Sequence, residues 1–185
     1  MYNWLSRNGY PVRQFTMGTE PQERPASAAP GSVSVSPLTQ RSLNSAAARL
    51  GKRGRLTSAQ WDALGALMHE GLHQMRFGRT PDVAGSEPMQ PGNARWYEEG
   101  AAEAATRDLL PIFARQMYGD AVNAPFMQTG YPGAVRNVRQ LSVFGSGAKR
   151  YQDYKARVWR RQFLHADADG RKKMVDDATA ARGAQ

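Results

Sequence analysis

With 185 residues, 41% of them hydrophobic, the chain can form one domain with a real core but not two full-sized domains. It contains no run of 18 apolar residues and no cysteine, so we expect no membrane-spanning helix, and any transition metal must be held by nitrogen and oxygen ligands. The 25 Lys and Arg against 16 Asp and Glu give a net charge of +9, which favours acidic or nucleic-acid partners, although a GC-rich genome explains many arginines equally well.

The N-terminal segment divides into an apolar and a linker-like part. Residues 1–18 contain scattered large apolar side chains, namely Tyr2, Trp4, Leu5, Tyr10, Val12 and Phe15, whereas residues 19–37 are rich in Pro, Ala and Ser. We therefore predict that residues 1–37 form an extended arm outside the main domain, with its apolar end docked either on its own domain or on a partner protein. The SVSV sequence at 32–35 is the best strand signal.

Helical signals begin near residue 38. Residues 39–50 form a short amphipathic stretch, and a clearer helix is expected over about 58–77. Thr57 and Gln60 have capping-box spacing at its start, and Gly78 suits the position after its end. Large apolar residues recur at three- and four-residue steps and predict a core-facing stripe: Trp61, Leu64, Met68, Leu72 and Met75.

A loop of about 14 residues with three prolines follows, and further helices come after it. Asn93 is expected to cap a helix over about 94–108, which Pro111 should end or kink. The remaining helical signals lie at 111–118, 133–143 and 148–164, before a polar tail at 167–185. The predicted fold is therefore mainly α, with a helical domain over 38–166 and at most a small β element.

The MHEGLH sequence in the first long helix places two imidazoles four residues apart. Four residues are about one helical turn, so His69 and His73 share one face, as two ligands of one tetrahedral metal must. Glu70 follows the first histidine directly, where its carboxylate can reach a water on the metal without binding the metal itself. This is the HExxH arrangement found in zinc metallopeptidases.

The second helix strengthens this interpretation. Its WYEEGAAE sequence resembles the W-x-x-E-G-x-A-E segment of the gluzincin metallopeptidases, the thermolysin- and aminopeptidase-like clan, and the resemblance covers residues 61–108. It implies a zincin-like helical domain, with Glu99 as the third zinc ligand and Glu103 as a residue that orients a ligating histidine. Glu98 is a rival ligand, about 100° round the helix.

A peptidase also needs a hydrogen-bond donor for the oxyanion of its intermediate. Tyr131 is our candidate for this catalytic role, because it stands where a loop meets a helix. Tyr118 and His165 are further candidates downstream. Each of the three side chains has an alternative structural role in packing.

These patterns predict a zinc-dependent metallopeptidase, in which Glu70 accepts a proton from a metal-activated water that attacks a peptide or protein substrate. Iron could use the same ligands, so zinc is inferred from the motif. The alternative is a structural component of a larger assembly, such as a bacteriophage virion or morphogenesis protein, that keeps a peptidase-like fold. A toxin or effector peptidase is a third hypothesis. The cytoplasm, or a particle assembled in it, is the expected location.

Basic residues concentrate near the C-terminus. Residues 136–173 contain eleven Lys or Arg against three Asp, with Tyr151, Tyr154 and Trp159 interleaved. Such a mixture can follow a phosphate backbone and stack on bases, which predicts weak nucleic-acid contact. The alternative is a solvated helix face whose aromatic residues belong to the core, Trp159 above all.

Overall fold

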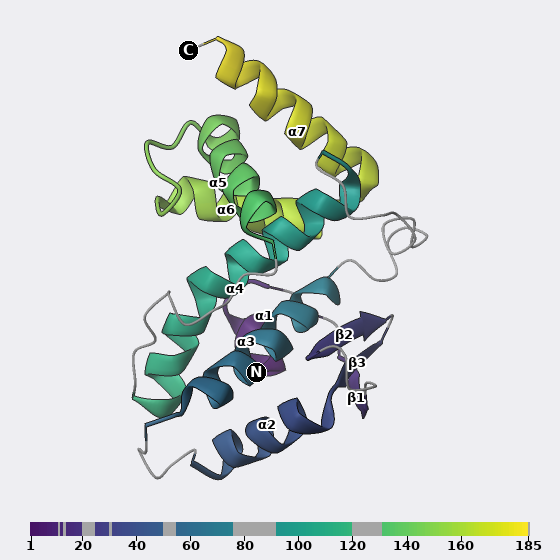
Figure 1. Ribbon diagram of the computed structural model, residues 1–185. Helices are drawn as coiled ribbons and strands as arrows, with labels where there is room; N and C mark the ends of the chain where they lie inside the picture. The colour runs from purple at the N-terminus through teal and green to yellow at the C-terminus, as the bar shows by residue number, and fades with distance from the viewer. Residues whose placement is uncertain are drawn as a thin grey trace. The chain divides into compact units, whose positions relative to one another are not determined.

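The computed structural model describes residues 1–10, 12, 14–19, 25–29, 31–49, 55–75, 92–119 and 131–184. Within these residues the protein is mainly helical with one small sheet, as the sequence predicts. The helices are α1 (Tyr2–Arg7), α2 (Pro37–Arg49), α3 (Ser58–His73), α4 (Ala94–Tyr118), α5 (Pro132–Ser146), α6 (Tyr154–His165) and α7 (Ala168–Gly183) (Figure 1). The strands are β1 (Thr16–Thr19), β2 (Ala26–Ala29) and β3 (Ser32–Val35).

The chain separates into two compact units. The first comprises Met1–Met75 and Thr106–Gln128, and the second comprises Arg76–Ala105 and Thr129–Gln185. The division falls within α4, so the first turns of that helix belong to one unit and its last turns to the other. The predicted single helical domain over 38–166 is therefore not the division that the structure shows.

In the first unit, α3 packs against α2 and against strands β2 and β3. The sheet has the order β1-β3-β2, with β1 parallel and β2 antiparallel to the central strand β3. Alternate residues of β3 are buried, namely Val33 and Val35, because successive side chains of a strand point to opposite faces. All five residues of the predicted α3 stripe are buried, which confirms the helical periodicity: Trp61, Leu64, Met68, Leu72 and Met75.

The predicted arm over residues 1–37 is wrong, because this segment contributes α1, all three strands and part of the core. Leu5 is 1% exposed and Val33 is fully buried. The indole of Trp4 packs edge-on against Phe113, with ring centroids 5.3 Å apart, and its Nε1–H donates to Gln116 at 2.6 Å. The apolar residues of 1–18 therefore dock on their own domain, one of the two outcomes that the sequence allows.

Helix α4 runs through Pro111 to Tyr118, so the two helices predicted at 94–108 and 111–118 are one. A proline inside a helix removes one backbone hydrogen bond and costs about 3 kcal/mol. Burial on either side offsets this cost, since Leu110 is fully buried and Phe113 is 3% exposed. At the other end, the side chain of Asn93 accepts a hydrogen bond from the backbone of Trp96 at 2.9 Å, as the predicted cap requires.

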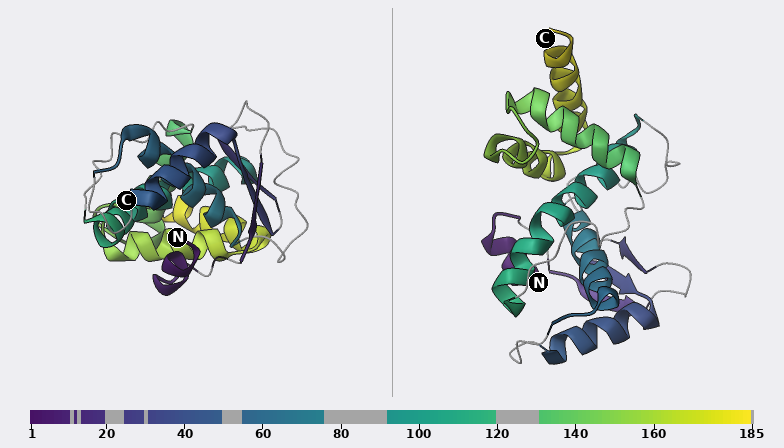
Figure 2. Two further views of the ribbon diagram at one scale, coloured as in Figure 1. Left: turned by 90° about the horizontal axis from the view of Figure 1, so that it is seen from below. Right: turned by 60° about the vertical axis from the view of Figure 1, so that its left-hand side comes forward.

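In the second unit, α5 packs against both α6 and α7 (Figure 2). The predicted helices at 133–143 and 148–164 correspond to α5 and α6. The segment predicted as a polar tail forms α7, capped by the Asp167 side chain, which accepts from the backbone of Gly170 at 2.8 Å. Ala178 of α7 is fully buried, so the segment is part of the fold.

Two sequence predictions lie outside the described residues: Gly78 as the end of the first long helix, and the proline-containing loop after it. Across the described ranges, no helix combines the length and the apolar character needed to cross a bilayer.

Candidate metal site

Helix α3 presents the two histidines through ordinary local structure. Its start is fixed by the predicted capping box: the backbone N–H of Thr57 donates to Gln60 Oε1 at 2.9 Å, and that of Gln60 donates to Thr57 Oγ1 at 3.3 Å. The buried stripe then fixes the rotation of the helix about its axis. His69 and His73, one turn apart, follow from that rotation.

The two imidazoles face each other at the C-terminal end of α3. Both side chains are buried, at 8% and 7% exposure, and their Nε2 atoms are 3.1 Å apart. Two imidazole ligands of a tetrahedral zinc, each about 2.05 Å from the metal, hold their nitrogens about 3.3 Å apart. The separation in α3 is therefore close to the spacing that a shared zinc requires, and both candidate ligand atoms are the same type of ring nitrogen.

Gln74, the residue after His73, ties the end of α3 to the sheet. Its side chain is fully buried. Its Nε2 donates to the carbonyls of Ala29 and Ser32 at 3.0 and 2.9 Å, and its Oε1 accepts from the backbone N–H of Gly31 at 3.1 Å. One amide thus binds three backbone groups of the β2–β3 connection and holds this connection beside the last turn of the histidine helix.

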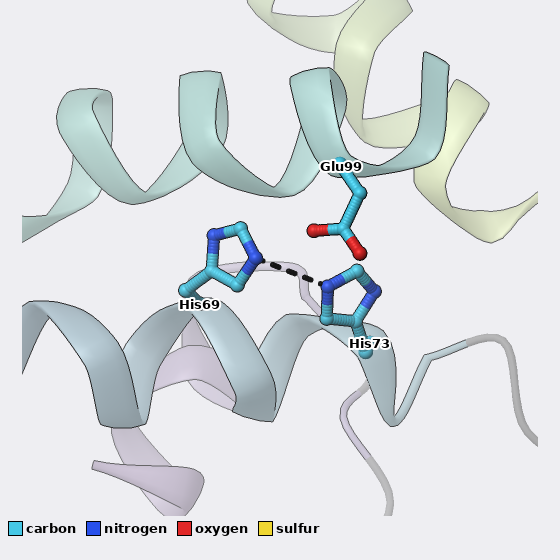
Figure 3. Close-up of side chains that lie close together, drawn as sticks. All are labelled: His69, His73 and Glu99. Atoms are coloured by element: carbon cyan, nitrogen blue, oxygen red, sulfur yellow. Dashed lines mark hydrogen bonds between the residues drawn. The ribbon is translucent and has the colours of Figure 1, made fainter. Parts of the chain in front are cut away.

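The third predicted ligand falls in the same group. One ligand atom from each of His69, His73 and Glu99 lies within 4.8 Å of the others (Figure 3). Within the described part of the chain, this is the single set of three or more His, Cys, Asp or Glu residues that meets this criterion. Glu99 is half-buried, on the first turns of α4.

The rival carboxylate, that of Glu98, has a different partner. Glu98 is 2% exposed, and its Oε2 forms an ion pair with Arg171 Nη1 at 3.4 Å. Arg171 of α7 also donates from Nε to the carbonyl of Phe163 at 3.0 Å and from Nη2 to that of Leu164 at 3.1 Å. Because consecutive helical residues point about 100° apart, the Glu99 side chain points away from this ion pair, which favours Glu99 as the candidate ligand.

Close helix packing fixes the same turns of α4. A side chain at Gly100 would place its first carbon 2.6 Å from the backbone of Ala134 in α5, which is closer than atoms can approach. The glycine next to Glu99 is therefore required where α4 and α5 touch. Glu103, one turn further along, is buried at 6% exposure. Its predicted role of orienting a histidine stays a prediction.

The remaining predicted residues are placed as follows. Glu70, the predicted base, is half-buried on α3. Tyr131 is the N-cap residue of α5, and its oxyanion role stays a prediction. Tyr118 packs edge-on against Trp61 and Phe113, and burial raises the pKa of its phenol, as expected of a packing residue. His165 ends α6.

Two residues beside the candidate ligands have no counterpart in the motif, namely Gln74 and Arg171. Gln74 follows HExxH directly, but a lone glutamine gives no signal of burial. Arg171 lies 73 residues from its partner Glu98, in a segment that is polar in sequence. A basic residue at 7% exposure must have an acidic or carbonyl partner, but the sequence does not identify that partner.

Comparison with protein-family models, with curated proteins and with solved structures finds no match to this chain.

Proposed function

We propose that the protein is a zinc-dependent metallopeptidase that uses His69, His73 and Glu99 as metal ligands. The observation that carries the proposal is the 3.1 Å separation of two buried Nε2 atoms on one helix, which suits a shared tetrahedral metal. The grouping of Glu99 with both imidazoles supports a third ligand. The gluzincin-like segment, read from sequence, gives this ligand set its peptidase interpretation.

The donor chemistry favours zinc over harder or softer metals. Two imidazoles and one carboxylate are a ligand set of catalytic zinc sites, which keep one position open for water. Magnesium and calcium prefer oxygen ligands, and copper(I) prefers sulfur, which this cysteine-free chain offers only as methionine. Iron(II) shares the ligand set, so the metal must be identified by measurement.

In this proposal, the residues of the chain bind the metal, orient it and move one proton. Bound zinc supplies Lewis-acid activation of water and of a peptide carbonyl. Glu70 accepts the proton released by the attacking water and passes it to the leaving amine. Glu103 orients a ligating imidazole, and Tyr131 donates a hydrogen bond to the developing oxyanion.

The deciding experiment separates metal binding from catalysis. Elemental analysis of the purified chain should find about one zinc per molecule. Glu70→Gln should retain that zinc and lose hydrolysis of a mixed fluorogenic peptide library, because an amide keeps the side chain's shape but cannot accept the proton. Asp62→Asn is the matched control, since it removes an exposed carboxylate from the same helix.

Two results would contradict the proposal. A wild-type chain that binds no zinc or other transition metal would remove its basis. An unchanged rate in Glu70→Gln would rule out this glutamate as the base. A zinc-loaded wild type that hydrolyses no peptide would instead favour the structural role in an assembly, in which the site serves stability.

A further inference from the structure

The exposed side of α6 has an unusual charge composition. Its twelve residues, YKARVWRRQFLH, contain no acidic side chain. Lys155 and Arg157 are exposed, Arg161 is half-exposed, and Lys149 and Arg150 are exposed in the turn before the helix. We call these five cations, together with Tyr154, the α6 basic face.

Two cations of the α6 basic face have local partners, since the Arg150 side chain pairs with Asp153 at 3.3 Å and Arg157 Nε donates to the carbonyl of Gln152 at 2.8 Å. The remaining basic residues of 136–173 lie outside this face. Several of those serve internal contacts: Arg160 donates to Ser142 and to the carbonyl of Tyr151, both at 2.9 Å, and Arg139 lies over the ring of Tyr151. On α7, the exposed Lys172 and Lys173 pair with Asp176 and Asp177, one turn on, each at 2.7 Å. No such pairing is available within α6, because it has no acid.

The position of the cations on α6 also disfavours a purely solvated face. Lys155 and Arg157 lie in the first turn, where the helix dipole favours negative charge. The adjacent Asp153 is already engaged: it accepts from the backbone of Lys149 and Arg150 and from the Arg150 side chain. The backbone N–H of Arg150 is the main cause that lowers the pKa of Asp153. A bound anion would offset the repulsion that remains.

Tyr154 supplies the second chemical feature of this face. It is 77% exposed, the highest value among the exposed large hydrophobic residues described, whereas Trp159 is 6% exposed and stacks on Phe163. Phe163 and Leu164 are likewise buried and Val158 is half-buried, so the outer side of α6 offers too little apolar surface to enter a membrane. An exposed aromatic ring among cations fits an unpaired base and its flanking phosphates.

We infer that the α6 basic face binds single-stranded nucleic acid, with Tyr154 stacking on a base and the surrounding Lys and Arg contacting phosphates. This inference goes beyond the proposed peptidase function and does not depend on the metal site, because every residue involved lies in 149–161. Binding should be independent of sequence, because stacking and phosphate contacts do not distinguish bases strongly.

The test uses the full-length chain and a fluorescein-labelled 20-mer of deoxythymidine, followed by fluorescence anisotropy. Binding should be measurable at about 50 mM salt and should weaken with added salt; three to five phosphate contacts give a slope of about −2 to −3.5 in log K against log salt. Arg157→Gln should reduce that slope by about 0.7. Lys173→Gln, which changes the net charge equally, should leave the slope unchanged, since Lys173 is paired with Asp177.

Tyr154 variants test stacking separately from charge. Tyr154→Ala should weaken binding about tenfold and leave the salt slope unchanged, and Tyr154→Phe should restore it. Circular dichroism would show that each variant is folded. The inference is overturned by absent binding at about 50 mM salt, by equal losses in Arg157→Gln and Lys173→Gln, or by an unaffected Tyr154→Ala. Binding of a matched duplex as tightly as the single strand would overturn the assignment to unpaired bases.

Discussion

The histidines of α3 and the glutamates of α4 are positioned by different kinds of interaction. On α3, a local capping box and a buried apolar stripe set the helix, and the four-residue spacing then brings the two Nε2 atoms to 3.1 Å. On α4, Glu98 and Glu99 are adjacent, and local helix geometry makes neither of them the ligand. In the proposed site, tertiary contacts decide between them, namely the Arg171 ion pair and the approach of Gly100 to Ala134.

This difference has consequences for how each part of the site can fail. The histidine pair requires only that α3 is folded, so changes elsewhere should leave the two imidazoles together. On α4, the neighbouring Glu98 is held by Arg171 of α7, which is itself fixed by carbonyls at the end of α6. A change far along the sequence should therefore destabilise the packing around the start of α4 while α3 remains intact.

The largest effect is expected from Arg171→Met. Removing one partner of a buried ion pair leaves the other charge poorly compensated and costs about 3–5 kcal/mol in the free energy of unfolding. Urea denaturation followed by circular dichroism should show this loss. Adding Glu98→Gln to Arg171→Met should recover part of it, because the buried charge is then removed as well. A double variant no more stable than Arg171→Met alone would contradict the ion-pair explanation.

Lys173→Met is the matched control for that comparison. Lys173 also forms an ion pair on α7, with Asp177, but the side chains of both residues are well exposed. Solvent screening makes such pairs weak, so the urea midpoint should hardly move. Equal losses in Lys173→Met and Arg171→Met would mean that burial does not distinguish the two pairs.

The second prediction concerns the ligand assignment within α4. Glu99→Gln should weaken zinc binding at least about 100-fold, the upper end of what loss of an orienting residue costs, whereas Glu98→Gln should change it by less than about threefold in the folded protein. Competition with a chromophoric chelator would measure both affinities. His73→Ala is the reference for loss of a ligand. If Glu98→Gln empties the site and Glu99→Gln leaves it full, the assignment is reversed.

The cobalt(II) form adds a spectroscopic check on the same variants. Cobalt substitutes for zinc, and its visible absorption depends on ligand number and geometry. Glu98→Gln should keep the wild-type spectrum, while Glu99→Gln should alter it. A spectrum that is unchanged in Glu99→Gln would show that this carboxylate does not bind the metal.

Features determined by nearby residues could be predicted from the sequence. The capping box at Thr57, the buried stripe of α3, the Asn93 cap and strand 32–35 are all present, because each depends on residues within a few turns of one another. The mainly helical fold class follows from the same periodicities. The histidine pair belongs to this group, since its geometry is that of one helical turn.

The failures share a different cause, which is burial supplied by distant residues. Composition made residues 19–37 resemble a linker, yet they supply strands β2 and β3, whose Val33 and Val35 are buried. The contacts of Trp4 with Phe113 and Gln116 connect segments more than 100 residues apart. Pro111 does not end the helix, one of the two outcomes expected of it, because packing on both sides carries α4 through it. The pairing of Glu98 with Arg171 could not be predicted from the sequence for the same reason.

The smallest predicted effect tests the contact between α3 and the sheet. Gln74→Leu keeps the volume of the side chain but removes its three hydrogen bonds to residues 29–32. These backbone groups are only part-buried, so water can replace some of the lost bonds. We therefore expect a loss near the lower end of the usual range, about 1 kcal/mol, measured as a shift in the urea midpoint.

Hydrogen exchange locates that loss, because the amide of Gly31 should exchange faster in Gln74→Leu while amides in the middle of α3 remain protected. Gln40→Leu is the matched control: Gln40 donates to Asn44 on the exposed side of α2, and its removal should leave the Gly31 amide unaffected. Zinc affinity should fall less in Gln74→Leu than in Glu99→Gln, since the histidine spacing is a property of α3 itself. If Gln74→Leu abolished zinc binding in a folded protein, the positions of His69 and His73 would depend on the sheet. The contrast between α3, which is set by local interactions, and α4, which is set by tertiary contacts, would then fail.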